Sequence, residues 1–443
     1  MIEKIIKRDG RVVPFDREKI TLAILSAAVA VGGRDRRTAE SVTGDVIARL
    51  EQKENQASYS TVEEVQDLVE KSLIERGHAK TAKAYIIYRY EHTLKRAGKE
   101  SLTYSSDNIP YKKLWQALSW GVDHGCSSLE QIRRAVEGGR FSSLVGQSEE
   151  FYRQELDAAV RMIGERIEEI RIIIVSGPSS SGKTTTTIKI GEKLKSLGCS
   201  LVSLNVDNYY YDLATHPKDS FGDYDYETPQ AIDLTLVNRH ITELLAGKTI
   251  QVPYYNFKTG NREGISGELS LGERQIIIID SLHGIFEEMT AGIPEEKKFK
   301  LYIETLSQIK GRDNRFIRWA DIRLLRRMVR DMQFRNYNPR QTLTHWHYVR
   351  RSELRYIIAR LRQANVIVNS FLAYELPLMK HRLGASFPRF IEEFQGNPER
   401  EDAFERARRI QEMFDQIPAW SEETVVPDTS LLREFLGGSS YSY

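Results

Sequence analysis

Cysteine is scarce in this sequence, because only Cys126 and Cys199 occur among its 443 residues. Two thiols exclude a disulfide scaffold and a cysteine-rich metal site, and they are typical of a protein that works in a reducing cytosol. Net charge is also lacking, since 64 basic residues almost balance 62 acidic ones and leave +2. The chain therefore has no overall positive field of the kind that attracts nucleic acid, and we expect no nucleic-acid partner.

Long apolar runs are absent as well. The longest weakly polar stretch, residues 20–33, is too short to span a bilayer. The first ten residues, MIEKIIKRDG, are charged and lack the apolar core of a signal peptide. We therefore expect a cytoplasmic protein with no membrane partner, long enough for two or three domains.

Local patterns divide the chain into segments of different character. Asp9-Gly10 predicts a hairpin turn, Asp16 an N-cap, and Gly77 the end of a second helix. Further on, β-branched runs alternate with helical stretches, which is the rhythm of an α/β fold with a mostly parallel sheet flanked by helices. We predict an α+β domain (1–95), a linker (96–110), a helical connector (111–169), an α/β domain (170–390) and a helical C-terminal extension (391–443).

A phosphate-binding loop is the strongest motif. GPSSSGKT matches G-x-x-x-x-G-K-[ST], with a β-branched run before it and a helical stretch after it. The glycines let the backbone wrap a phosphate, the lysine reaches the β- and γ-phosphates, and the threonine ligates Mg²⁺. We predict an ATP site made of Gly177, Ser179, Ser180, Ser181, Gly182, Lys183, Thr184 and Thr185.

Two aspartates follow buried-strand candidates and are expected near this loop. Asp280 ends the run IIIID, the usual place of the acidic residue that serves the metal ion. Asp207 ends LVSLNV, and ligands of open parallel sheets bind at such strand ends. Asp207 would accept the proton of an attacking hydroxyl group and contact Mg²⁺. The predicted metal ligands are Thr184, Asp207 and Asp280.

Arginines recur in DIRLLRRMVRD with helical spacing. Residues 323, 326, 327 and 330 place four guanidinium groups on one helical face, where they repel one another unless anions bind. A solvated basic face is the plain alternative. Beside a phosphate-binding loop, a lid that stabilises a transferring phosphoryl group is favoured.

Residues 171–376 resemble the uridine kinase/phosphoribulokinase group of P-loop kinases. The resemblance rests on GPSSSGKTT, DNYY, YDYETPQAID, PYYNFKTGNR, DIRLLRRMVRD and NVIVNSFLAYEL, in this order. It is nearest to bacterial uridine-kinase-like proteins that usually carry an N-terminal TGS domain. It implies a general base at Asp207, an acceptor pocket at Tyr210, Tyr226 and Glu227, a base-stacking ring at Tyr255, an acceptor-side Arg323, and lid arginines at Arg326, Arg330 and Arg335.

Three positions depart from that group's pattern. Gly260 stands where uridine-cytidine kinases have a histidine that helps read the pyrimidine, and Glu227 replaces their ribose-binding aspartate. Asp280-Ser281 replaces a Glu-Gly pair, so the metal contact would run through water. The acceptor is therefore left open between nucleosides and sugar-like molecules.

The first 95 residues resemble an ATP-cone, the nucleotide-sensing module of ribonucleotide reductases. KRDGRVVPFDREKI, VEEVQDLVEKSL and AKAYIIYRYE carry this resemblance. It implies a second adenine nucleotide, ATP or dATP, bound through Lys7, Arg8 and Lys19. Such a module would regulate the kinase by shifting an equilibrium of assemblies, and we expect a homo-oligomer.

The leading hypothesis is therefore an ATP- and Mg²⁺-dependent kinase of a small hydroxylated acceptor, under control of the cone. Its chemistry would be carried by Asp207, Lys183, Arg326 and Arg330. A nucleotide sensor with little or no transferase activity is the alternative. A P-loop ATPase or GTPase switch is weaker, because the chain has no guanine-reading N-K-x-D motif.

Overall fold

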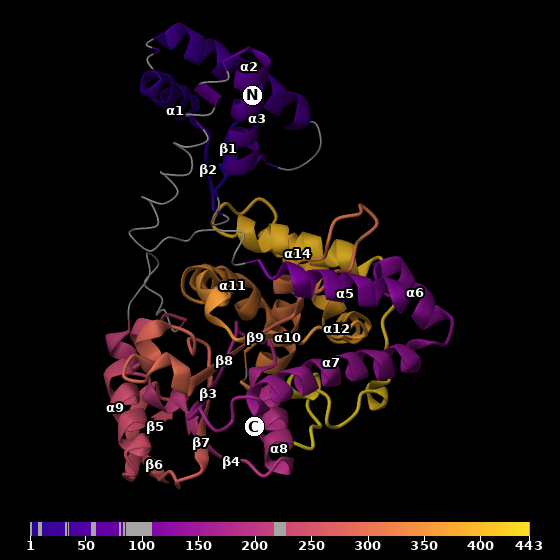
Figure 1. Ribbon diagram of the computed structural model, residues 1–443. Coiled ribbons are helices and arrows are strands. Elements are labelled where there is room, and N and C mark those ends of the chain that lie inside the picture. Colours follow the sequence, from indigo (N-terminus) through magenta and orange to yellow (C-terminus); the bar gives the residue numbers. More distant parts are fainter. Residues whose placement is uncertain are drawn as a thin grey trace. The chain divides into compact units, whose positions relative to one another are not determined.

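The computed structural model describes residues 2–7, 11–31, 33, 35–54, 59–78, 81–82, 85, 109–216, 227–335 and 337–442. The chain forms two units, one of residues 1–103 with 394–405 and one of residues 104–393 with 406–443 (Figure 1). The turn at Asp9-Gly10 and nearly all of the predicted linker lie outside the described residues, and the predicted division into five segments stays a prediction.

The described part of the N-terminal segment contains two paired strands and three helices. Strands β1 (Lys4–Ile6) and β2 (Val12–Pro14) pair antiparallel, and the helices are α1 (Arg17–Ala30), α2 (Arg36–Glu54) and α3 (Val62–Glu75). Asp16 caps α1 as predicted, because its carboxylate accepts a hydrogen bond from the N–H of Glu18 at 3.1 Å. Gly77, with φ of +75°, follows the end of α3. Buried aliphatic side chains of the strands and helices make a core of their own.

A five-stranded parallel sheet organises the second unit. The strands follow the order β4-β7-β3-β8-β9, and every neighbouring pair is parallel. All five residues of the central strand are buried, and the first four are β-branched, as expected for a strand covered on both faces. This confirms the predicted fold class. The strands are β3 (Ile172–Ser176), β4 (Ser200–Asn205), β7 (Gln275–Ser281), β8 (Lys298–Glu304) and β9 (Val366–Asn369).

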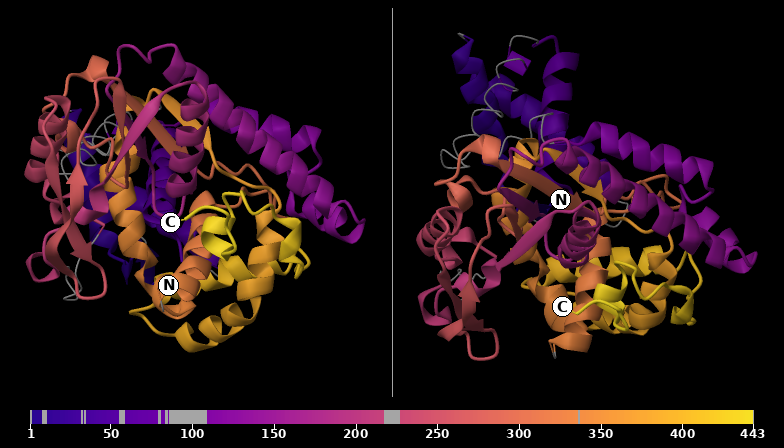
Figure 2. Two further views of the ribbon diagram at one scale, coloured as in Figure 1. Left: turned by 90° about the horizontal axis from the view of Figure 1, so that it is seen from below. Right: turned by 60° about the horizontal axis from the view of Figure 1, so that its bottom comes forward.

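Helices surround the sheet, and an antiparallel ribbon of β5 (Ile250–Asn256) and β6 (Asn261–Leu269) extends beside it. Figure 2 shows the ribbon and α9 (Leu234–Leu245) on one side of this unit and residues 406–436 on another. The other helices are α5 (Tyr111–Asp123), α6 (Leu129–Glu137), α7 (Phe141–Gly164), α8 (Lys183–Ser196), α10 (Trp319–Phe334), α11 (Pro339–Ser352), α12 (Glu375–Leu383), α13 (Phe387–Phe394), α14 (Glu401–Phe414) and α15 (Arg433–Leu436).

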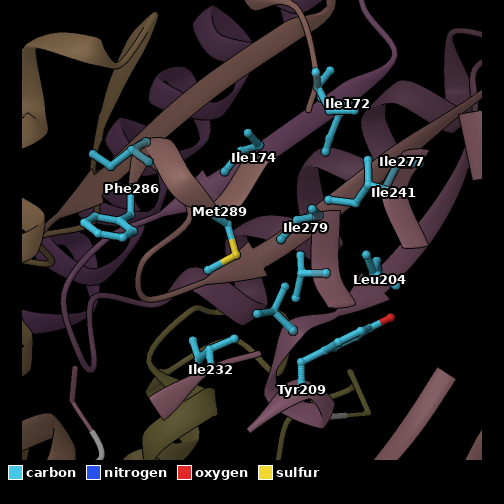
Figure 3. Close-up of a cluster of buried hydrophobic side chains, with 14 of the residues drawn as sticks. Ile172, Ile174, Leu204, Tyr209, Ile232, Ile241, Ile277, Ile279, Phe286 and Met289 are labelled. Carbon is cyan, nitrogen blue, oxygen red and sulfur yellow. The ribbon is translucent and has the colours of Figure 1, made fainter. Parts of the chain in front are cut away.

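One apolar cluster fixes the strands that lead to the site. Alternate isoleucines of β3 and β7, among them Ile174 and Ile279, meet Leu204 of β4 and Met289 (Figure 3). Full burial of such a side chain contributes about 1.5–3 kcal/mol. The strand ends are therefore held rigidly, which is what a site built on them needs. In the described part of the chain, no helix is both long and apolar enough to cross a membrane.

Candidate active site

The phosphate-binding loop joins β3 to α8 and needs its glycines. A Cβ on Gly177 would lie 2.3 Å from the carbonyl oxygen of Ile303, so no larger residue fits between the loop and β8. Gly182 has φ of +90° and caps α8, a left-handed conformation that glycine adopts without strain. Ser180 also has a positive φ, of 59°. The loop thus has the tight, wrapped backbone that the motif predicts.

Hydrogen-bond donors of this loop are left for an anion. The hydroxyl groups of Ser180 and Ser181 are buried and have no partner among the described residues. The Nζ of Lys183 has a hydrogen bond of 3.4 Å to the carbonyl oxygen of Pro178. The N-terminus of α8 adds N–H groups and the positive end of its dipole. Together these groups suit the phosphates of a nucleotide.

Two of the predicted metal ligands meet directly. Asp280 lies on β7, paired with Val175 of β3, and its Oδ2 accepts a hydrogen bond of 2.9 Å from Thr184. Burial raises the pKa of Asp280 to about 6, although Lys183 and the Thr184 hydroxyl act in the opposite direction. Within the described ranges no group of three His, Cys, Asp or Glu side chains could hold a metal ion. Two hard oxygen ligands still fit Mg²⁺, which takes its other ligands from phosphates and water.

Asp207 follows the end of β4. It comes two residues after Asn205, which pairs with Asp280 of β7 in the sheet. Its N–H donates to the side-chain oxygen of Asn205 at 3.0 Å, which fixes the turn. The residue is exposed, but surrounding protein displaces part of its hydration and raises the pKa of its carboxyl group. Lys183, Arg335 and Arg330 act on the carboxylate in the opposite direction. Four predicted site residues thus lie within electrostatic reach of one another.

Aromatic side chains gather next to Asp207. Tyr210 lies 5.5 Å, centroid to centroid, from Tyr255 of β5, and Tyr255 lies 4.9 Å from Phe257. The buried hydroxyl group of Tyr255 has no hydrogen-bond partner among the described residues. At Gly260, with φ of +72°, an added Cβ would lie 2.9 Å from the Cβ of Leu213, so no side chain fits there. Tyr226 lies outside the described residues.

Glu227 is tied to the phosphate-binding loop by Arg327. One nitrogen of Arg327 donates both to the Oγ of Ser179, at 3.0 Å, and to Oε1 of Glu227, at 2.8 Å. Burial raises the pKa of Glu227, but nearby positive charge, above all that of Arg327, more than offsets this and the net shift is downward. A carboxylate is therefore held ionised beside the loop. Arg327 belongs to the predicted arginine face but was not among the site residues predicted from the sequence.

The arginines of α10 divide into two kinds. Arg323 and Arg326 are fully buried: Arg323 pairs with Glu304 and Glu353 and donates to the carbonyl oxygen of Ser179, and Arg326 pairs with Glu375. Their roles at the acceptor and the phosphates stay predictions.

Arg330 is partly buried and contacts Asp331, while the side chain of Arg335 is 56% exposed. Burial lowers the pKa of Arg330 to about 10, and the neighbouring charge of Arg335 adds to this. Both cations lie near Asp207. These two are therefore the predicted lid arginines that the structure brings to the site.

In the N-terminal unit, Lys7 and Lys19 are both exposed, and Lys19 lies 3.4 Å from Asp16. Arg8 lies outside the described residues. Nothing in this unit tests the predicted nucleotide contacts, which stay predictions.

Comparison with known proteins supports both predicted resemblances. Residues 172–376 match the Phosphoribulokinase / Uridine kinase family, and residues 3–94 match the ATP cone domain. A uridine kinase of Halalkalibacterium halodurans is 31% identical over 198 residues, 44% of this chain and 84% of that protein. A uridine kinase of Deinococcus deserti is 29% identical over 198 residues, 44% of this chain and 86% of that protein.

The N-terminal part has relatives of another kind. A vitamin B12-dependent ribonucleoside-diphosphate reductase of Thermoplasma acidophilum is 38% identical over 112 residues, 24% of this chain and 14% of that protein. The matched segment includes no more than a small part of the reductase. The chain thus joins an ATP cone domain to an ATP-dependent small-molecule phosphotransferase with a hydroxyl acceptor, and it belongs to the phosphoribulokinase/uridine kinase family.

Proposed function

We propose that this chain transfers the γ-phosphoryl group of ATP to a hydroxyl group of a nucleoside or sugar-like molecule. The observation that carries the proposal is the gathering of Lys183, Arg330 and Arg335 around Asp207, at the carboxyl ends of β3 and β4. A carboxylate with a raised pKa next to a phosphate-binding loop is suited to act as the general base that deprotonates an alcohol. A protein that only sensed phosphates would not need such a base.

The proposed reaction is an in-line displacement. Asp207 accepts the proton of the acceptor hydroxyl group, whose oxygen forms a bond to the γ-phosphorus while the bond to the β–γ bridging oxygen breaks and ADP leaves. Lys183 and Arg330 offset the negative charge on the phosphoryl oxygens. A magnesium ion held by Thr184 and Asp280, with Asp207 beside it, would neutralise further charge on the phosphates.

The acceptor is the finer part of the proposal. Tyr210 and Tyr255 supply aromatic walls beside the base, and Glu227 supplies a carboxylate for hydroxyl groups. The relatives named uridine kinase make uridine the first acceptor to test. Gly260, covered by Leu213, leaves no room for the histidine of uridine-cytidine kinases. Pentoses and polyols therefore belong in the same panel.

The experiment is a coupled assay of ADP release with a panel of nucleosides, pentoses and polyols, using wild type and Asp207→Asn. We expect one acceptor class to stimulate ADP release, and the variant to lose about 10²–10⁴-fold in kcat while it still binds ATP. ATP binding without transfer to any acceptor would contradict the proposal and favour a nucleotide sensor.

We also propose that the ATP cone domain regulates this activity. The match over residues 3–94 supports this, and the exposed Lys7 and Lys19 are the described residues assigned to its nucleotide. The rate of phosphoryl transfer at saturating acceptor should change when dATP is added. The double variant Lys7→Ala/Lys19→Ala should not show that change. Lys71→Ala, an exposed lysine on α3, is the matched control. A dATP effect that persists in the double variant would contradict this assignment.

A further inference from the structure

The helix α15 lies against the phosphate-binding loop, although it comes from the far end of the chain. Leu431 packs directly on Gly182, where an added Cβ would lie 2.3 Å from the Cδ1 of the leucine. Leu431, Leu432 and Phe435 are buried, and the hydroxyl group of Ser430 contacts Tyr374. The backbone of this segment is therefore a fixed wall of the loop.

From this wall, a carboxylate reaches the first turn of α8. One oxygen of Glu434 accepts two hydrogen bonds from Thr185, 3.1 Å from the backbone nitrogen and 2.7 Å from Oγ1. The backbone N–H of Thr185 is among the first-turn donors that have no partner within the helix. In a phosphate-binding loop such donors cradle the α- and β-phosphates of the nucleotide.

We propose that the Glu434 carboxylate is an internal substitute for a nucleotide phosphate, and that a bound nucleotide displaces it by rotating the side chain away from Thr185. This inference rests on the proposed ATP site. Both groups are anionic oxygens that use the same donor, so they compete for it. The carboxylate also lies within electrostatic reach of Asp280. Phosphates bound at the loop would add negative charge close to Glu434, repel it and favour its rotation.

The consequence is a nucleotide affinity below what the loop alone would provide. Hydrogen bonds to an ionised carboxylate are among the stronger ones in proteins, and they must be broken before the phosphate binds. The apparent affinity is the intrinsic affinity multiplied by the fraction of molecules in which the carboxylate has released the donor. We expect this competition to weaken nucleotide binding about tenfold. Ligands without a phosphate should not be affected.

The test compares ADP with adenosine, by isothermal titration calorimetry of the full chain. Glu434→Gln keeps the shape of the side chain and removes its charge, and Glu434→Ala removes the acceptor. Glu422→Gln is the matched control, because Glu422 is exposed in the same C-terminal part of the chain. We expect the Kd for ADP to fall about tenfold in both Glu434 variants, with the adenosine Kd unchanged and the control equal to wild type.

The possible outcomes distinguish competition by Glu434 from other roles of this residue. An ADP affinity that is unchanged or weaker in both Glu434 variants would overturn the inference and leave Glu434 as a helix cap or a nucleotide contact. An equal gain for ADP and adenosine would also overturn it, because the carboxylate would then oppose the nucleoside and not the phosphate. If neither wild type nor any variant binds ADP, the proposed ATP site itself is wrong. Circular dichroism checks that the variants are folded. If Glu434→Ala does not fold, the isosteric variant Glu434→Gln alone decides the outcome.

Discussion

Replacing Arg327 by methionine removes the cation that joins the phosphate-binding loop to Glu227. The side chains of this ion pair are 15% and 11% exposed, so water screens the pair weakly. Unit charges about 4 Å apart attract by about 4 kcal/mol at an effective dielectric constant of about 20. Removing one partner of a buried pair costs about 3–5 kcal/mol, because the other charge stays buried. We expect Arg327→Met to lower the free energy of unfolding by about 3 kcal/mol at pH 7.5.

The pH dependence of this loss has a defined sign. In wild type the pKa of Glu227 is lowered, so the pair stabilises the fold above the ordinary glutamate pKa and loses this contribution as the pH falls. Without Arg327, burial raises the pKa of Glu227 above its ordinary value. The carboxylate then destabilises the fold increasingly as the pH rises from the ordinary glutamate pKa to the raised one. The difference between variant and wild type should therefore shrink when the pH is lowered from 7.5 to 5.5.

Urea unfolding followed by tryptophan fluorescence measures this effect. All five tryptophans lie within residues 115–420 of the second unit, so the signal reports on the unit that contains the pair. Glu227→Gln in the Arg327→Met background should restore about 2 kcal/mol, since no buried charge is left unpaired. Arg340→Met is the control, because its pair with Glu393 is about half exposed and contributes less than about 1 kcal/mol. Strictly additive losses in the double variant would refute the reasoning.

Two further predictions concern Asp280 and Arg326. Burial raises the pKa of Asp280 to about 6, so its carboxylate destabilises the metal-free protein increasingly as the pH rises from about 4 to 6 and constantly above. Asp280→Asn should therefore raise the free energy of unfolding by about 2 kcal/mol at pH 7.5, while it weakens Mg²⁺-dependent activity. Urea unfolding measures the stability, and a variant no more stable than wild type at pH 7.5 would contradict this prediction. Arg326→Met leaves Glu375 buried alone and should cost about 3–5 kcal/mol. If Arg326 instead acts on phosphates, kcat would fall without such a loss of stability.

The phosphate-binding loop and three strands were predictable because their signals are local. The runs before Gly177 and Asp280 are β-branched, the run before Asp207 alternates apolar and polar residues, and the three form β3, β7 and β4. Strand β8 was not predicted, because KFKLYIE looks half polar. Its two lysines, Lys298 and Lys300, are in fact buried, and both form ion pairs with Glu295.

The arginine face was predictable in spacing but not in the partner of each side chain. Repulsion among like charges favours nearby anions, but the spacing alone does not show whether a ligand or the protein supplies them. For Arg323 and Arg326 the anions are glutamates of the fold itself, from β8 and from segments about 30–50 residues further along the chain. Glu434 was equally out of reach, since it lies 249 residues from Thr185 and only the folded chain brings the two together.

The strand order has a consequence for the folding of the chain during synthesis. The central strand β3 has β7 and β8 as its neighbours, and neither begins before residue 275. About 100 residues must therefore be made after Ile172–Ser176 before that strand can pair, which takes on the order of 5–20 s at common elongation rates. During this time an apolar, β-branched segment has no sheet to join, which favours aggregation. Folding of the kinase unit should therefore be slow and dependent on chaperones at the stage when β3 waits for β7.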